Sequence, residues 1–373
     1  MHAPSQTTFH TTSHTKSRLR LLVVRLGAMG DILHALPAVT ALRIAHPDWI
    51  IDWVVEPRWQ ALLTAPGVDA PVQDTGQPNP RRPVVNQLLF AATRDWRRAP
   101  FSGDTIHQFN ALLRSLRAAR YDAVLDLQGA VRSAVLARLT GCPRRIGEAE
   151  PRERAARWLF TEPVPTVGAH VIQQDLELAS AVAADELQHV QPWLPVDPDA
   201  EAWAEQLFAA APRLPAVLLN PGAGWGAKRW PVERYAQVTK SLIENGFRIF
   251  INIGPGEEPL AQAIVQHAGP HAIPLQGNLA RLIAVTRRVA LAIAGDTGPL
   301  HLACALGRPV VGIYGPTDPS RNGPFGTRFQ VLRSPLSRRD HSRHPQPEAG
   351  LLTIQPEDVL RAARALLYPE TVP

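Results

Sequence analysis

Cysteine is scarce in this sequence. Cys142 and Cys304 are the only two cysteines among 373 residues. They lie far apart and neither has a neighbour at metal-ligand spacing, so the sequence supports neither a disulfide framework nor a cysteine-based zinc site. The expected compartment is therefore a reducing cytosol.

Long uncharged runs are also missing. The longest, residues 259–280, contains three prolines together with Gln, His and Asn residues, and it predicts no transmembrane helix. Near the start, apolar residues 21–24 follow basic ones, as in a signal peptide, but Arg25 interrupts the run almost at once. Residues 1–18 are expected to form a polar disordered tail.

Length and charge set the broad class of the protein. A chain of 373 residues exceeds what one hydrophobic core usually supports, so two domains are expected. Its 45% hydrophobic and 19% charged residues are typical of globular proteins. The formal charge of +6, from 39 Lys and Arg against 33 Asp and Glu, fits an acidic substrate or an anionic membrane surface. Nucleic acid would fit the same sign.

Short apolar runs, each followed by a stretch of helical periodicity, recur along both halves of the chain. This pattern predicts an α/β fold of two doubly wound, Rossmann-like domains. Between residues 76 and 105 the chain is rich in Pro and Arg and shows little periodicity. The predicted strands are residues 21–24, 50–55, 122–127, 216–220, 248–253, 289–294 and 309–314.

Proline marks the boundary between the two domains. Pro192, Pro195 and Pro198 each remove a backbone donor and disfavour helix before them, which predicts a linker. The expected division is a tail at 1–18, an N-terminal domain at 19–190, a linker at 191–200, a C-terminal domain at 201–352, and a helix within 353–373 that packs back towards the N-terminal domain.

The strongest local signal for a ligand is Asp296-Thr297-Gly298, with His301 one turn later, where a predicted strand stops and a helix starts. Such a junction presents free backbone N–H groups and the positive end of a helix dipole, which favour a phosphate group. In an open α/β sheet, ligands bind at this end of the strands. The alternative is that Asp296 or Thr297 only caps the helix.

A second strand-to-helix loop, residues 220–231, supplies glycines and a lysine. Gly222 and Gly224 let the backbone approach an oxygen-rich ligand, and Lys228 can neutralise a diphosphate without a metal. A dinucleotide fingerprint is disfavoured, because the third glycine spacing is wrong and the next strand does not end in an acid. Glu257 and Glu258, just after that strand, are candidates to bind ribose hydroxyls, or are only favourable charges at a helix start.

In the first half, Asp31 lies at the tip of the first predicted strand, in Gly27-Ala28-Met29-Gly30-Asp31. A carboxylate there can act as the general base of a transfer with inversion, or it can cap its helix. His34 is expected to be structural. The single Asp-x-Asp pair, Asp197 and Asp199, lies in the linker and is expected to start a helix, so no metal site is assigned.

Arginines concentrate on the same half of the chain. Their planar forks suit carboxylates and phosphates, so they fit an acceptor with several negative charges, although many exposed arginines only solvate a helix face. They lack the interleaved aromatic residues of a nucleic-acid surface, so no nucleic-acid partner is expected. The arginines concerned are Arg94, Arg97, Arg98, Arg114, Arg117, Arg120 and Arg132.

Four motifs together resemble one enzyme family, the ADP-heptose lipopolysaccharide heptosyltransferases of glycosyltransferase family 9. Their order and spacing match over nearly the whole chain. Two further segments, 94–98 and 126–134, most resemble heptosyltransferase I, which adds the first heptose to the Kdo residue on lipid A. The four motifs are Gly27-x-x-Gly30-Asp31-Ile32-Leu33-His34, Asn220-Pro221-Gly222 with Lys228-x-Trp230-Pro231, Asp296-Thr297-Gly298-x-x-His301, and Tyr314-Gly315-Pro316-Thr317-Asp318-Pro319.

The resemblance implies a GT-B fold with the active site in the cleft between the domains, and an inverting, metal-independent glycosyltransferase without a cofactor. It gives Asp31 the role of base and Lys228 that of diphosphate ligand. The implied donor-binding residues are Gly222, Ala223, Gly224, Lys228, Glu257 or Glu258, Asp296, Thr297, Gly298 and His301. The implied acceptor-binding residues are Gly30, Arg94, Arg97, Arg98, Gln128 and Arg132.

The reaction implied by this resemblance is transfer of heptose from ADP-L-glycero-D-manno-heptose to Kdo-lipid A. The enzyme is then expected to be cytoplasmic and peripheral on the anionic inner membrane. One alternative is a heptosyltransferase for a later position of the core. An alternative of another class is a nucleotide-sugar 2-epimerase on a similar fold, which would convert the donor with no acceptor present.

Overall fold

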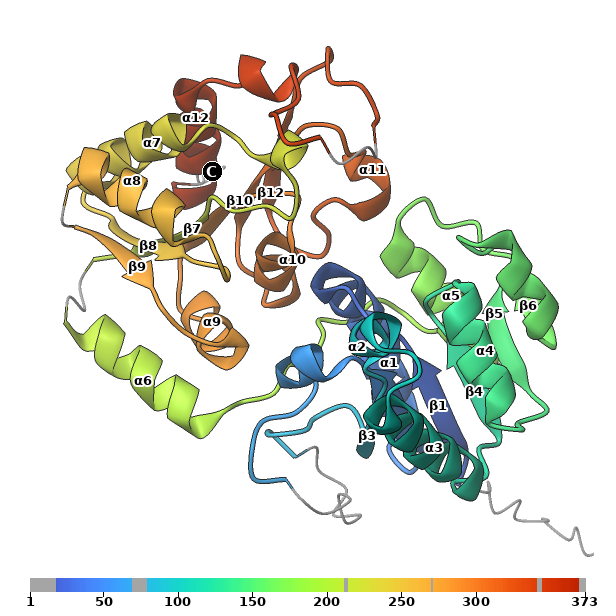
Figure 1. The fold of residues 1–373 in the computed structure, drawn as a ribbon. Coiled ribbons are helices and arrows are strands. Elements are labelled where there is room, and N and C mark those ends of the chain that lie inside the picture. Colours follow the sequence, from blue (N-terminus) through green and yellow to red (C-terminus); the bar gives the residue numbers. More distant parts are fainter. Residues whose placement is uncertain (1–17, 69–78, 211–213, 270, 341–343, 369–373) are drawn as a thin grey trace, which may run out of the picture.

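The computed structural model describes residues 18–68, 79–210, 214–269, 271–340 and 344–368. These form two α/β domains, each built on a parallel six-stranded sheet, which lie side by side across a gap in Figure 1. The two doubly wound domains predicted from the sequence are therefore confirmed. Of the tail expected at residues 1–18, all but Arg18 lie outside the described residues.

The first sheet has the strand order β3-β2-β1-β4-β5-β6. Its strands alternate apolar side chains between two covered faces, as parallel strands do when helices lie on both sides. In β1, Leu21 and Val23 pack in one core cluster and Leu22 and Val24 in another. The strands are β1 (Arg20–Val24), β2 (Ile50–Val55), β3 (Gln87–Phe90), β4 (Ala123–Asp126), β5 (Arg145–Glu148) and β6 (Glu162–Val164).

Helices cover both faces of this sheet. Helices α1 (Met29–Ala45) and α5 (Val171–Ala183) share one core cluster, and α3 (Gly103–Ala118) and α4 (Val131–Leu139) share the other. The shorter elements of the domain are η1 (Pro57–Leu62), α2 (Thr93–Arg98) and η2 (Arg154–Leu159). The poorly periodic region at 76–105 thus contains β3 and α2, which are too short for a repeating apolar pattern to reveal.

The second sheet repeats this arrangement in the order β12-β11-β10-β7-β8-β9. Its strands are β7 (Ala216–Asn220), β8 (Arg248–Asn252), β9 (Ala272–Leu275), β10 (Leu291–Gly295), β11 (Val310–Tyr314) and β12 (Phe329–Arg333). Its helices and 3-10 turns are α6 (Pro198–Ala209), η3 (Gly226–Lys228), α7 (Val232–Glu244), α8 (Glu258–Ala268), α9 (Leu279–Thr286), α10 (Gly298–Ala305), α11 (Pro319–Asn322), η4 (Leu351–Thr353) and α12 (Pro356–Leu367).

The segment between the domains ends where α6 begins. The side chain of Asp197 accepts hydrogen bonds from the backbone N–H groups of Asp199 and Ala200, at 3.0 and 3.2 Å. This is helix capping, as expected for the Asp-x-Asp pair.

The last helix corrects the sequence-based expectation. Helix α12 packs on the second domain's own sheet, against α7 and strands β10 to β12, and not back towards the first domain (Figure 1). Val359, Ala363 and Leu366 are buried in the same core cluster as strand residues of that sheet. The apolar stripe of α12 is therefore used to close the second domain's core.

Candidate functional site

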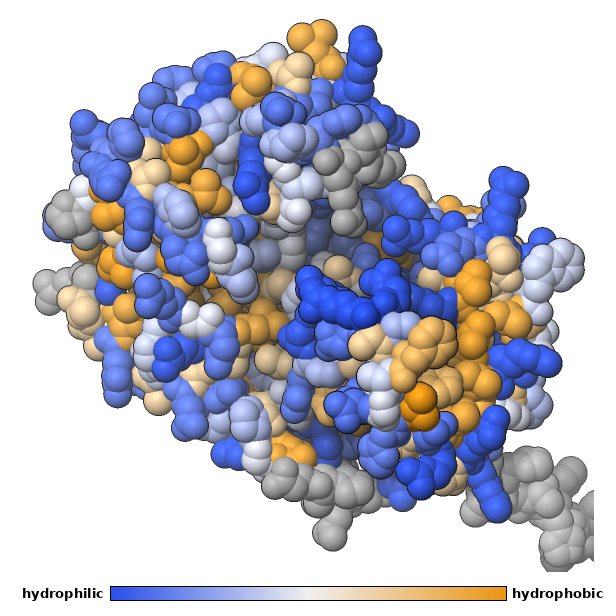
Figure 2. Space-filling view, in the orientation of Figure 1, coloured by the Kyte–Doolittle hydropathy of each residue, from blue (hydrophilic) through white to orange (hydrophobic). Residues whose placement is uncertain are grey.

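A polar cavity of about 490 Å³ lies between the two domains. Both sheets point the carboxyl ends of their strands towards this gap, which is where an open α/β sheet binds ligands. Figure 2 shows the surface hollowed there, with hydrophilic side chains gathered at its edge. The charged residues that line the cavity are Arg25, Asp31, Asp126, Glu148, Arg152 and Asp175 from the first domain and Lys228, Asp296 and Arg321 from the second.

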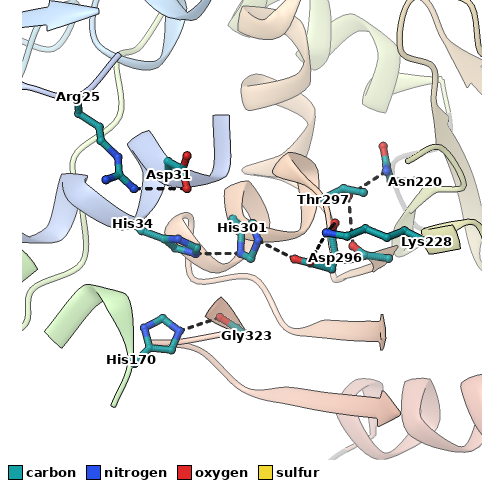
Figure 3. A network of polar contacts seen from close by, with 11 residues as sticks. Arg25, Asp31, His34, His170, Asn220, Lys228, Asp296, Thr297, His301 and Gly323 are labelled. Atoms are coloured by element: carbon teal, nitrogen blue, oxygen red, sulfur yellow. Dashed lines mark hydrogen bonds and ion pairs between the residues drawn. The ribbon is translucent and has the colours of Figure 1, made fainter. Parts of the chain in front are cut away.

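Asp296 is the centre of the second domain's side of the cavity. It follows β10 directly, and its carboxylate accepts from Lys228 Nζ at 2.5 Å and contacts His301 Nε2 at 3.3 Å (Figure 3). Burial alone would raise the pKa of Asp296, but the hydrogen bond and charge of His301, followed by Lys228, outweigh it and lower the pKa. Asp296 is therefore a buried carboxylate that holds Lys228 in the cavity wall.

The helix-capping alternative for this turn is wrong. Thr297 is the N-cap residue of α10, yet its side chain makes no capping hydrogen bond. Its hydroxyl instead donates to Gly295 O at 3.2 Å and accepts from Asn220 Nδ2 at 3.1 Å. Asp296 and Thr297 both bond elsewhere, Pro299 has no N–H group, and Leu300 N donates to Thr297 O at 3.1 Å. The backbone N–H of Gly298, the first residue of α10, is therefore the one in this first turn that can serve an anion.

The glycine-rich loop packs closely against Glu257. A Cβ atom built at Gly222 would lie 2.0 Å from Glu257 Oε1, so a larger residue there would displace the Glu257 carboxylate. The Glu257 carboxylate also accepts from Gly254 N at 2.9 Å. Glu258, by contrast, is exposed. The structure thus separates two acids that the sequence left equivalent, and only Glu257 faces the Gly222 loop.

The rest of the loop surrounds Lys228. Its ammonium lies 5.1 Å from the ring centroid of Trp225, within cation–π range. Ala223 is buried and its carbonyl accepts from Arg229, whereas Gly224 is exposed. Neither Ala223 nor Gly224 offers a polar side chain, so at these two positions the loop can bind a ligand only through its backbone.

Asp31 faces the cavity from the first domain, in the first turn of α1. One carboxylate oxygen accepts from Ala28 N at 2.8 Å, and the other lies 3.3 Å from Arg25 Nη2. Asp31 therefore does cap its helix, as the alternative held, but its side chain is 37% exposed while Arg25 is 8% exposed. The capping bond leaves the carboxylate accessible to a ligand in the cavity.

Two glycines let the domains meet next to this site. A Cβ atom at Gly30 would lie 2.8 Å from His301 Cδ2, and one at Gly298 would lie 2.5 Å from Met29 Sδ. Helices α1 and α10 can therefore cross closely. Gly30 packs against His301 and is not among the residues that line the cavity, and its predicted contact with an acceptor stays a prediction.

Histidines connect the two domains at this crossing. His34 Nε2 lies 3.1 Å from His301 Nδ1, so a chain of contacts runs from His34 through His301 and Asp296 to Lys228 (Figure 3). Burial, followed by the charges of His301 and His170, lowers the pKa of His34 well below its usual value. His34, which was expected to be structural, thus links the first domain to the turn at Asp296 in the second domain.

The predicted acceptor arginines lie outside the cavity. Arg94, Arg97 and Arg98 are exposed on α2, and Arg132 is exposed at the start of α4. Gln128 does line the cavity, but its side-chain oxygen already accepts from Leu26 N at 3.0 Å. An acceptor role for these residues stays a prediction, and for the arginines it would be at the rim.

Sequence reasoning missed several charged cavity residues: Arg25, Asp126, Glu148, Arg152, Asp175 and Arg321. Arg25 had one available signal, since a basic residue directly follows a buried strand at its ligand-binding end. Asp175 had none, because it lies inside a helix without a motif around it.

Comparison with known proteins gives consistent matches. The family model "Glycosyltransferase family 9 (heptosyltransferase)" matches residues 109–351. Lipopolysaccharide heptosyltransferase 1 of Escherichia coli K12 is 31% identical over 335 residues, which is 85% of this chain and 94% of that protein. Lipopolysaccharide heptosyltransferase 2 of the same strain is 26% identical over 368 residues, covering 94% and 99%.

Solved structures match over the same length. E. coli heptosyltransferase WaaC with ADP aligns with a TM-score of 0.74 at 26% identity, covering 93% of this chain and 100% of that one. The same enzyme with ADP-2-deoxy-2-fluoro heptose aligns with a TM-score of 0.71. The two-domain architecture is the GT-B fold that the resemblance implied.

Proposed function

Since this chain belongs to glycosyltransferase family 9, the heptosyltransferases, we propose that it transfers heptose from ADP-L-glycero-D-manno-heptose to Kdo of the lipopolysaccharide inner core, as heptosyltransferase I. The observation that carries the proposal is one cavity lined by Asp31 from the first domain and by Lys228 and Asp296 from the second. A base and a phosphate-binding cation face the same space, as a transfer between two bound substrates requires.

On the donor side, the diphosphate would lie between Lys228 and the start of α10. Lys228, the backbone N–H of Gly298 and the positive end of the helix dipole would supply positive charge where negative charge develops on the departing ADP. Asp296 would orient Lys228, and Glu257 would accept hydrogen bonds from the ribose hydroxyls. Solved WaaC structures that contain ADP and an ADP-heptose analogue support a donor of this class.

On the acceptor side, Asp31 would act as the general base. The acceptor hydroxyl oxygen attacks the anomeric carbon, its proton passes to the Asp31 carboxylate, and the bond from that carbon to the diphosphate oxygen breaks. Attack from the face opposite the leaving group inverts the anomeric centre. Arg25, 3.3 Å from Asp31, would hold the carboxylate in the cavity until the proton arrives.

The direct test is incubation of the purified protein with ADP-heptose and defined acceptors. We expect ADP release and a mass increase of one heptose with Kdo-lipid A, and neither with an acceptor that already carries the first heptose. Transfer only to the latter would favour the later core position. Isomerisation of the donor without acceptor, followed by NMR, would favour a 2-epimerase instead.

An acceptor anchored in lipid requires the enzyme to meet a membrane, and we place the contact on the face formed by α2, α3, α4 and η2. Phe101 and Trp158 there are two large aromatic side chains that are 91% and 86% exposed. Arg94 and Arg97 are exposed nearby on α2. Aromatic side chains with arginines are typical of binding to an anionic bilayer interface. No helix in the described part of the chain is long and apolar enough to cross a bilayer.

Replacing Phe101 and Trp158 together by serine is expected to weaken vesicle binding about tenfold, because each ring loses its apolar contact with lipid. The measurement is co-flotation with phosphatidylcholine vesicles that contain phosphatidylglycerol. Leu336→Ser, which alters a side chain that is 72% exposed in the second domain, is the matched control. Equal binding by parent and double variant would remove this face from the role.

A further inference from the structure

Asp175 is a buried acid without a partner. It lies within α5 and is 3% exposed. Its carboxyl group makes no hydrogen bond and no ion pair to any residue that the structure describes, and Oδ2 is fully enclosed. Native proteins rarely bury a polar group in this way, since an unsatisfied carboxyl destabilises the fold. Such a group calls for an explanation in function.

A structural role does not explain Asp175. It is not a helix cap, because it occupies the fifth position of α5. It lines the polar cavity, and Arg25, the first opposite charge that acts on it, has its ion pair with Asp31.

The location of Asp175 points to the acceptor. It lines the same cavity as Asp31, and α5 packs directly against α1, the helix that carries Asp31. The charged groups around it are Arg25, Asp31 and Glu148 from the first domain and Arg321 from α11 of the second. It belongs to the first domain, whereas Lys228 and Asp296, which line the same cavity, belong to the second.

The protonation of Asp175 suits a sugar ligand. Burial, with smaller contributions from Asp31 and Glu148, raises the pKa of Asp175 to about 7, while Arg25 and Arg321 oppose the rise. Near neutral pH the group therefore exists in both forms. A carboxylic acid can donate a hydrogen bond and a carboxylate can accept one, and a sugar hydroxyl can complement either.

We propose that Asp175 binds a hydroxyl group of the acceptor sugar and orients the sugar so that its reacting hydroxyl meets Asp31. The role rests on the proposed function, because it assumes a sugar acceptor in this cavity. Asp175 would be a specificity-determining residue, since a buried polar group that is satisfied only by the correct ligand discriminates strongly against one lacking that hydroxyl.

Two substitutions test the proposal. Asp175→Leu keeps the branching at Cγ and removes the hydrogen bond, and Asp175→Asn keeps the size of the side chain together with a donor and an acceptor. With ADP-heptose saturating, we expect Asp175→Leu to raise the acceptor KM at least about tenfold. Asp175→Asn should change the acceptor KM less than about threefold. The donor KM should stay within about twofold of the parent value in both variants, because Asp175 belongs to the first domain and the proposed donor ligands Lys228 and Asp296 belong to the second. Asp185→Leu, at an exposed position just after α5, is the matched control.

Thermal unfolding provides an independent readout. Asp175→Leu should raise the Tm, because it removes an unpaired buried carboxyl. A raised pKa means that the acid stabilises the folded state at low pH and loses that effect as pH rises through about 7. The gain in Tm over the parent should therefore widen between about pH 4 and pH 7 and level off above.

Failure of the proposed function and failure of the Asp175 proposal give different results. Turnover by the parent enzyme tests the proposed function, and the ratio of acceptor KM between parent and variant tests Asp175. An unchanged acceptor KM in a folded, active Leu variant would overturn the proposal. So would a fall in Tm for both variants, since that would show Asp175 to be a satisfied structural group. A higher Tm together with a higher acceptor KM would support it.

Discussion

The substitution Asp31→Asn is expected to lower kcat about 10³-fold, which is within the range of rate loss when a general base is removed. The affinity for ADP should stay within about twofold of the parent value. The amide keeps the size of the carboxylate and can still accept from Ala28 N, which Asp31 does at 2.8 Å. It cannot take the acceptor proton. The measurement is ADP release under saturating donor and acceptor, with ADP affinity from calorimetry.

The structural contacts of Asp31 must be separated from its chemistry. Losing the contact to Arg25 and weakening the helix cap should lower the free energy of unfolding by about 1 kcal/mol, which denaturant unfolding will show. Asp185→Asn, at an exposed acid just after α5 in the same domain, is the control and should retain parental activity. Near-parental kcat for Asp31→Asn would show that another group takes the proton.

The substitution Lys228→Met is expected to lower kcat/KM about 10²- to 10³-fold. This is comparable to the rate loss when an enzyme loses one group that stabilises developing charge. Met retains the volume of the Lys228 side chain but removes the positive charge 2.5 Å from Asp296. The departing ADP then loses the stabilising charge of Lys228 and keeps the backbone N–H at the start of α10. ADP affinity should fall with kcat/KM, and Lys240→Met, at an exposed position on α7, should change neither.

A second variant separates charge loss from damage to Asp296. Without Lys228, the carboxylate keeps only His301, and its pKa should rise towards that of a buried acid. The double variant Lys228→Met, Asp296→Asn removes the unpaired charge, so it should recover stability but not activity. Recovery of activity in the double variant would mean that Lys228 acts only by neutralising Asp296.

Most of the fold follows from local pattern in the sequence. The strands around Leu21, Ala216 and Leu291 are runs of buried apolar residues that end in a turn and are followed by helical periodicity. Such patterns depend on residues a few positions apart, so they are visible without tertiary contacts. The short elements β3 and α2 were not predicted, because they span too few residues for an apolar pattern to repeat.

The placement of α12 escaped for a different reason. Its apolar stripe showed that the helix packs on something, but a stripe does not identify the surface that it covers. Only the assembled sheet of the second domain, where Val359 and Leu366 join the core, decided that.

The candidate site divides in the same way. The sequence by itself determined that Asp31, Lys228 and Asp296 each stand at a strand-to-helix junction, because backbone order and turn residues are local properties. Only the tertiary structure decided between alternatives at those positions. It showed that Asp296 and Thr297 do not cap their helix, that Glu257 and not Glu258 faces the Gly222 loop, and that Gly30 packs against His301.

The residues found only in the structure are those whose properties arise from long-range proximity. Asp175 carries no motif, and its burial, its raised pKa and its lack of a partner all come from groups that the fold brings to one cavity. Electrostatic interaction and desolvation depend on distance in space, whereas a sequence records only order along the chain. Local order therefore determined the two domains and the strand-to-helix junctions of the candidate site, and spatial proximity decided which side chains at and around those junctions face the cavity.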